Sequence, residues 1–426
     1  MPTESLLINM PLPGPMPAEE HVWRVLAAHL GRAVNFTHPK QPAREYVATP
    51  SEAPGRLLRL AYEPGEQQAA DLTLCPIQDD RGKRFLWART SRIDVRAESS
   101  GWNVKSDLIA PLRLLLELRE EHEVPLRDRY GLVEGKSSRR NAFGALAEPF
   151  PESTATFLAR LLGLERAGPF PGGKSWAIAV SCDVDVLEDD HIPAVLRFLG
   201  EHRVESPTFM ICTASPEEKT IRDPSYDFVS GDVRARLAHL REAEVEIGLH
   251  GSYVAHDRLE MLVDQKKRLE DWCRRPVAGH RSHFYRFAYP RSWAWQYRAG
   301  FSYDASLGYP DLPGFRSGAA SPTQFCDPEH GPVAFAACPT GILDQHFFWP
   351  NAWPEEQVEQ FLSSLVSRLA SLGGVLTVDW HSYTSSSSYP GWWARLGHVL
   401  DLARARGAYL AGIGKVLSYY ARDWLR

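Results

Sequence analysis

Carboxylates and imidazoles gather directly after apolar, strand-like segments in the second part of the chain. The side chains concerned are Asp183, Asp185, His250, Arg281, His283 and His381. Carboxylate and imidazole together bind zinc or a similar divalent ion and leave one position open for water. Such an ion lowers the pKa of the water and polarises a carbonyl group. A second carboxylate can then accept a proton, and a separate imidazole can donate one to a leaving amine. These residue types predict a hydrolytic metal site.

Asp183 and Asp185 are two residues apart, so on a regular strand they would share a face. At a strand end the backbone turns, and one carboxylate can bind metal while the other acts as a base. Each residue alone also has a structural interpretation: an Asp after a strand is often a helix N-cap, and His250 could be a hydrogen-bonded core histidine. The shared position at the ends of successive strands, rather than any single residue, indicates a site.

Alternating strands and helices must position these residues. The predicted strands include Trp176–Cys182, Pro207–Cys212, Val245–Leu249 and Gly374–Trp380, and the predicted helices include Ile192–His202, Asp232–Ala243, Leu259–Cys273, Glu355–Leu372 and Trp392–Arg406. Strands separated by single helices favour parallel pairing through right-handed crossovers. Residues 175–426 therefore predict an α/β fold, a distorted and incomplete (β/α) barrel. In such barrels the chemistry lies at the carboxyl ends of the strands.

Residues 1–166 predict a smaller α+β domain of unknown role before the barrel. Its expected helices are Glu19–Leu30, Leu108–Glu121 and Ser153–Leu164, and Leu57–Ala61 reads as one of its strands. The Gly- and Pro-rich segment Ala167–Lys174 predicts a linker between the two domains.

The composition narrows the classes of function. The chain has 426 residues, 44% of them hydrophobic, and a formal net charge of −5. Its basic residues are dispersed, which argues against a nucleic-acid partner. No run of about 18 apolar residues predicts a transmembrane segment, and no export signal is recognisable at the N-terminus. We therefore expect a cytoplasmic protein whose six single cysteines are reduced thiols.

Three segments of the second part resemble the NodB-homology polysaccharide deacetylases, the fourth carbohydrate esterase family. Ser181–Asp185 stands where that family has a strand ending in Thr-Phe-Asp-Asp, and Pro207–Ile211 resembles its second strand. Ala243–His250 (AEVEIGLH) resembles the Gly-His-Glu-Ile-Gly-Asn-His segment closely. The resemblance covers about Trp176–Tyr419. It implies a distorted (β/α) barrel that removes acetyl groups from N-acetylated sugars with a divalent metal.

The resemblance also implies individual roles. Asp183 would be the base that activates a metal-bound water, and Asp185 and His250 would be metal ligands. Arg281 would orient Asp183 and keep it ionised through a charge-assisted hydrogen bond. His381, in Asp379-Trp380-His381, would be the general acid and oxyanion partner.

The second motif departs from the family pattern. The family has His-(Ser/Thr)-x-x-His, but Val254 stands four residues after His250. A third ligand must come from elsewhere, and we favour His283 because a neighbouring strand end can face the same ion. His256 is the alternative. A missing third ligand, which would leave metal binding weak or absent, is also open.

The substrate and metal follow from the same resemblance. We expect a carbohydrate substrate, with Tyr253, Asp304, Arg316, Asp344 and Trp380 as its contacts. Zinc is the expected ion, and Co²⁺, Mn²⁺ and Ni²⁺ are alternatives. The segments Arg127–Gly131 and Pro149–Leu162 resemble, more faintly, an uncharacterised domain that precedes such deacetylases.

The predicted activity is metal-dependent removal of N-acetyl or a related acyl group from a sugar or polysaccharide precursor. Two alternatives stay open. One is a metal-dependent hydrolase of small cyclic amides on the same fold. The other is a catalytically silent homologue in which the altered second motif marks a lost metal site and the aromatic side chains bind glycan.

Overall fold

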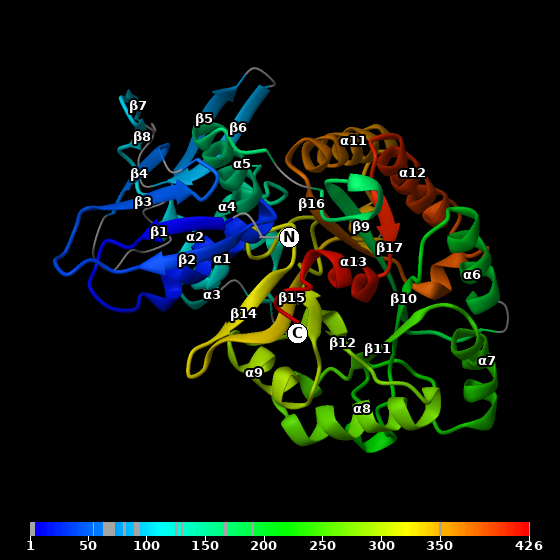
Figure 1. The fold of residues 1–426 in the computed structure, drawn as a ribbon. Helices are drawn as coiled ribbons and strands as arrows, with labels where there is room; N and C mark the ends of the chain where they lie inside the picture. Colours follow the sequence, from blue (N-terminus) through cyan, green and yellow to red (C-terminus); the bar gives the residue numbers. More distant parts are fainter. Residues whose placement is uncertain are drawn as a thin grey trace. The chain divides into compact units, whose positions relative to one another are not determined.

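The computed structural model has two compact units (Figure 1). It describes residues 5–53, 55–62, 73–79, 82–88, 94–123, 127–128, 131–142, 144–165, 168–188, 191–348 and 352–425. Met1–Pro125, Ser138–Gly168 and Ser317–Ala319 make up the first unit. The second comprises Leu126–Ser137, Pro169–Arg316 and Ala320–Arg426, so a short segment from before residue 166 belongs with the barrel. Arg129 and Tyr130 of the Arg127–Gly131 segment lie outside the described residues.

The first unit is an α+β unit built on one six-stranded sheet. The strands are β1 (Ser5–Asn9), β2 (Ala33–Thr37), β3 (Glu45–Pro50), β4 (Leu57–Ala61), β7 (Val95–Glu98) and β8 (Gly101–Val104), in the order β2-β1-β3-β4-β8-β7. Burial alternates along β3 and β4, so Tyr46, Ala48, Leu58 and Leu60 face a core. The helices α1 (Pro17–His29), α2 (Ile109–Leu116) and α5 (Phe150–Leu162) contribute to the same core, and β5 (Thr73–Asp79) and β6 (Gly82–Ala88) form a separate hairpin.

The single helix expected over Leu108–Glu121 is two helices. The helix α2 ends at Leu116, and a second helix, α3, begins at Arg119 and ends at Glu123. Leu118 lies between them in the left-handed region, with φ of 52°, and its side chain is buried. The apolar spacing continues across the break because the buried leucine still faces the core, so the periodicity alone could not reveal the bend.

The second unit is a closed (β/α) barrel, which confirms the predicted fold class. Its strands are β9 (Trp176–Val184), β10 (Thr208–Ile211), β11 (Glu246–Gly251), β12 (Gly279–Ser282), β13 (Tyr303–Leu307), β15 (Gly331–Leu343) and β16 (Gly374–Asp379). Within the described residues these strands pair in parallel in that order, and β10 pairs with β9 to close the ring. The short strand β17 (Tyr409–Ala411) adds to β9, and β14 (Thr323–Asp327) lies antiparallel to β15. The barrel is thus short of eight strands.

Helices follow most barrel strands, and in Figure 1 most of them lie around the ring, whereas the last, α13, lies over its middle. They are α6 (His191–Glu201), α7 (Gly231–Glu242), α8 (Leu259–Cys273), α9 (Arg291–Arg298), α11 (Glu355–Leu372), α12 (Trp392–Ala405) and α13 (Ile413–Tyr420). The strands are buried on both faces, as a parallel sheet covered by helices requires. Because neighbouring barrel strands are parallel, their carboxyl ends meet at one end of the barrel. No helix in the described parts of the chain is both long and apolar enough to cross a membrane.

Candidate metal centre

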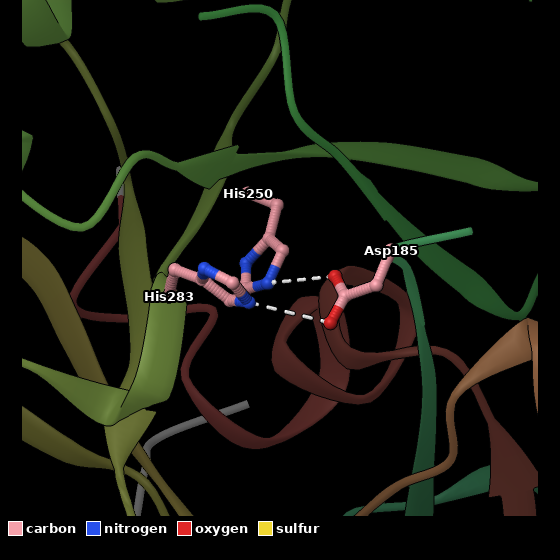
Figure 2. Close-up of side chains that lie close together, drawn as sticks. All are labelled: Asp185, His250 and His283. Atoms are coloured by element: carbon pink, nitrogen blue, oxygen red, sulfur yellow. Dashed lines mark hydrogen bonds and ion pairs between the residues drawn. The ribbon is translucent and has the colours of Figure 1, made fainter. Parts of the chain in front are cut away.

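Asp185, His250 and His283 converge at the carboxyl ends of the barrel strands (Figure 2). Asp185 directly follows β9, His250 lies near the end of β11, and His283 begins the short helical turn η6 (His283–Tyr285) after β12. The two oxygens of Asp185 are each 3.3 Å from an Nε2 atom, Oδ1 from that of His250 and Oδ2 from that of His283. One ligand atom from each residue lies within 4.8 Å of the other two. Two imidazoles and a carboxylate are a donor set suited to zinc.

The orientation of His250 leaves a lone pair for an ion. Its Nδ1 donates to the carbonyl of Arg281 at 3.1 Å, which places the lone pair of the neutral ring on Nε2. That Nε2 and Oδ1 of Asp185 are buried and have no hydrogen-bond partner among the described residues. Two lone pairs 3.3 Å apart repel unless a proton or a metal ion lies between them. The chain's own residues therefore fit a divalent ion.

Gly251, next to His250, has no side chain, and this leaves space for the imidazole of His280. A Cβ at this position would lie 2.4 Å from Nε2 of His280, whose imidazole is fully buried. His280 is itself fixed by Asp304, because its Nδ1 lies 3.0 Å from Oδ1 of that residue. A larger residue at 251 would therefore displace the strand end that carries His250.

His283 is oriented by a carboxylate on its other side. Its Nδ1 lies 3.5 Å from Oδ1 of the buried Asp223, and this leaves Nε2 towards Asp185. Asp223 is held in turn, because it accepts hydrogen bonds from the amides of Tyr253 and Thr220. A carboxylate behind a ligand imidazole fixes its tautomer and raises its basicity.

The turn after His283 is conformationally strained. Phe284 and Tyr285 both lie in the left-handed region, with φ of 59° and 54°. Each such residue costs about 1–3 kcal/mol and persists only where the surroundings enforce it. The turn places His283 against Asp185 and the Tyr285 hydroxyl against Asp379, to which it donates at 2.9 Å. Strain of this kind collects at functional sites.

Asp183 is paired with a buried guanidinium. Nη1 of Arg281 donates to Oδ1 of Asp183 at 2.6 Å, and Nη2 donates to the Ser181 hydroxyl at 2.8 Å. The same Nη1 lies 2.9 Å from Oδ1 of Asp379, so two buried carboxylates share one guanidinium nitrogen. Burial acts to raise the pKa of Asp183, but Arg281, His250 and His381 outweigh it and hold that pKa below its usual value. Burial and the charge of Asp183 raise the pKa of Asp379 well above its usual value.

His381 forms a dyad with Asp344 on another side of Asp185. Nδ1 of His381 lies 2.8 Å from Oδ1 of Asp344, and Nε2 lies 3.4 Å from Oδ2 of Asp185. The backbone amide of His381 also donates to Asp344. Burial opposes protonation of His381, but Asp344 and Asp185 raise its pKa well above the usual value. In the metal-free protein His381 is therefore an imidazolium with an oriented Nε2–H.

One cavity of about 170 Å³ has a polar lining that consists of Asp183, Asp185, His283, Tyr285, Gln345, Asp379 and His381. Phe284, Pro310 and Leu343 form apolar parts of its wall. The cavity thus places an ionised carboxylate, a protonated imidazole and the candidate ligand group next to an apolar surface.

The pKa of His283 yields a test of the metal-free protein. Burial lowers that pKa, but Asp185 and Asp223 raise it from 6.5 to about 9. Proton binding is tighter in the folded state, so this contribution to stability is complete below about pH 6.5 and is lost as the pH rises through about 9. We expect the free energy of unfolding of the metal-free protein to fall by roughly 3 kcal/mol over this range. Urea unfolding at several pH values measures the total slope, and His283→Gln should reduce it by the His283 share, while the share from the raised pKa of His381 remains. An unchanged slope in that variant would contradict the assignment.

The structure does not bring the other expected residues into this cavity. His256 is buried with Nδ1 3.9 Å from Asp257, and burial together with Arg286 lowers its pKa to about 4. It is not part of the ligand group around Asp185, whereas His283 is. The proposed substrate contacts Tyr253, Asp304, Arg316 and Trp380 are buried side chains that do not line the cavity, and Asp344 orients His381 from behind.

Two contributors have no predicted role: Asp223 was not noticed in the sequence, and Asp379 was noticed only as part of the motif around His381. Asp223 lies in the long connection between β10 and α7, where no motif marks it, so nothing in the sequence could have identified it. Asp379 ends β16 and pairs in register with Ser181 of β9. The rule that titratable residues at strand ends collect around the site places it there, although only His381 of this motif was given a role.

Comparisons with known proteins find similarity of structure only. No family model matches the chain, and the search of curated proteins found no match. A putative polysaccharide deacetylase from Mycobacterium smegmatis is 16% identical, with a TM-score of 0.45 over 60% of this chain and 94% of its own. Puue allantoinase is 10% identical, with a TM-score of 0.45 over 62% of this chain and 96% of its own.

A family 4 carbohydrate esterase from Streptomyces lividans in complex with acetate is 9% identical, with a TM-score of 0.33 over 56% of this chain and 92% of its own. Polysaccharide deacetylases and family-four esterases are the group that the sequence motifs resemble. At these values the similarities do not carry an activity over to this chain.

Proposed function

We propose that the chain is a divalent-metal-dependent hydrolase that removes an N-acetyl or related acyl group from a sugar or polysaccharide precursor. The observation that carries this proposal is the convergence of Asp185, His250 and His283 beside a cavity that Asp183 and His381 also line. When bound, a zinc or similar ion would supply a water of lowered pKa and polarise the scissile carbonyl.

Asp183 is the base in this proposal. Its pKa lies below the usual value despite burial, so it is ionised at neutral pH and can accept a proton from the attacking water. Arg281 holds Oδ1 of Asp183, and this leaves Oδ2, which lies 3.5 Å from His250 Nε2, on the side of the ligand group. Arg281 is a positioning residue, because it acts through Asp183.

His381 is the acid. Asp344 occupies its Nδ1, so the proton available for transfer is on Nε2, the atom that faces Asp185 and the cavity. The charge of Asp344 raises the pKa of His381 and so favours a proton on this atom, which a departing nitrogen can take. A base and an acid on the same cavity are what cleavage of an amide requires, since water loses a proton and the amine gains one.

A metal assay combined with an acyl-release screen tests the proposal. We expect about one equivalent of zinc or a similar ion in protein purified without chelator, and acetate release from N-acetylated oligosaccharides that chelator abolishes and zinc restores. Ring opening of a cyclic amide without acetate release would contradict the proposed substrate. Metal-free protein that binds glycan without turnover would contradict the enzymatic assignment itself.

A further inference from the structure

Residues 309–312, here called the rim loop, form one border of the cavity. Pro310 lines the cavity, and Tyr309 beside it is almost fully buried. The position of this loop therefore sets the distance between Pro310 and the apolar residues Phe284 and Leu343, which line the same cavity.

His346 attaches the rim loop from the barrel. It lies in α10 (Gln345–Phe348), just after β15, and its Nε2 donates to the carbonyl of Tyr309 at 2.9 Å. Its Nδ1 accepts from the amide of Leu343 at 3.1 Å. Burial lowers the pKa of His346 to about 4, so the ring is neutral and can serve as donor and acceptor at once. One imidazole thus joins two parts of the cavity wall.

Asp311 attaches the loop to a segment that comes much earlier in the chain. Its Oδ1 accepts from the amide of Gly135 at 2.6 Å, and its Oδ2 accepts from the amide of Lys136 at 3.0 Å. Both carboxylate oxygens are therefore used on consecutive backbone donors, which is a strong and directional contact. A Cβ at Gly135 would lie 3.1 Å from the Tyr309 ring and 3.3 Å from Leu312 Cβ, so the two segments are closely packed.

The earlier segment has an ordered structure of its own. Leu132 and Val133 are buried, and Val133 forms an antiparallel bridge with Arg127. The Asp128 carboxylate accepts from the Leu132 amide at 2.9 Å. Leu126–Ser137 belongs to the same compact unit as the barrel, so the Gly135 and Lys136 amides are presented to Asp311 by a fixed support.

We infer that residues 131–137 fix the rim loop through Asp311, and that this contact limits the length of the acyl group that the cavity accepts. The inference rests on the proposed acyl hydrolysis and adds its specificity determinant. While Asp311 holds the rim loop, Pro310 keeps the cavity small, which favours an acetyl group. When that contact is lost, Pro310 can move outward and the cavity admits a longer acyl chain. Asp311 is a positioning residue in this scheme, since it does not line the cavity itself.

The experiment compares zinc-loaded wild-type protein with Asp311→Ala and Asp311→Asn on 4-nitrophenyl acetate and 4-nitrophenyl butanoate. We expect Asp311→Ala to raise the ratio of kcat/KM for butanoate over acetate roughly tenfold, a typical discrimination for small changes in chain length. Asp311→Asn keeps one acceptor oxygen and should fall between. Hydrogen exchange measured by mass spectrometry should show faster exchange at residues 131–137 in both variants.

Asp327→Ala is the matched control. Oδ1 of Asp327 accepts from the amides of Glu329 at 2.9 Å and His330 at 3.0 Å, a similar carboxylate-to-backbone contact on β14 that does not line the cavity. The ratio of kcat/KM for butanoate over acetate in Asp327→Ala should equal that of the wild type. An unchanged ratio in an active Asp311→Ala enzyme would overturn the inference alone. A wild-type protein that releases acetate neither from these esters nor from N-acetylated oligosaccharides would overturn the proposed function and the specificity role with it.

Discussion

Asp183→Asn is expected to bind metal as the wild type does and to lose most of its turnover. The amide keeps the shape of the side chain and leaves Asp185, His250 and His283 in place, but it cannot accept a proton from water. Loss of a general base typically costs about 10²- to 10⁴-fold in rate. Metal content by mass spectrometry and kcat for acetate release measure the two effects separately.

Asp379→Asn is a matched control, because Asp379 and Asp183 both contact Nη1 of Arg281. Burial and the charge of Asp183 raise the pKa of Asp379 well above its usual value, so ionisation of Asp379 is less favoured than that of Asp183 and an amide is a closer replacement for it. We expect a much smaller loss of turnover in this variant. Full activity of Asp183→Asn would exclude Asp183 as the base.

His283→Ala is expected to lose bound metal, whereas His256→Ala should retain it. His283 lies 3.3 Å from Asp185 and completes the ligand group, while His256 lies outside that group, 3.9 Å from Asp257. Both imidazoles are buried, so the pair controls for the general cost of removing a buried ring. Removal of an outer partner of a ligand costs about 10- to 100-fold in metal affinity, so loss of the ligand itself should exceed that.

Competition with a chromophoric chelator gives the two metal affinities directly. Asp223→Asn adds an intermediate case, because it leaves the His283 ring in place and replaces the carboxylate behind it by a neutral amide. We expect it to fall between the wild type and His283→Ala. Equal metal affinity in His283→Ala and the wild type would exclude His283 as a ligand.

The barrel and the meeting of the polar residues follow from patterns that are local in the chain. Apolar runs of strand length separated by helical periodicity predict parallel strands, and the carboxyl ends of parallel strands meet. The expectation for Asp183, Asp185, His250 and His283 needed only the positions of the strand ends. Its preference for His283 over His256 agrees with the observed geometry, in which a neighbouring strand end brings His283 to Asp185.

Features that depend on distant contacts could not be predicted. The strand β15 was missed because Pro332, Pro339 and Gly341 interrupt its pattern, and such residues normally argue against a strand. Its prolines are tolerated beside the irregular registers that it forms with β13, β14 and β16. The role of Asp223 depends on where a long connection folds back, and no local periodicity encodes that.

The Asp311 contact bears on how readily this barrel could be exchanged between proteins during evolution. A recombination point at the Gly- and Pro-rich stretch near residue 168 would transfer every barrel strand and every residue of the candidate metal centre. It would leave Gly135 and Lys136 behind, and the two oxygens of Asp311 would lose their backbone donors. Inheritance of the candidate metal centre and inheritance of the cavity border are therefore separable events. A descendant of such an exchange would keep the metal centre while the border of its cavity was open to change.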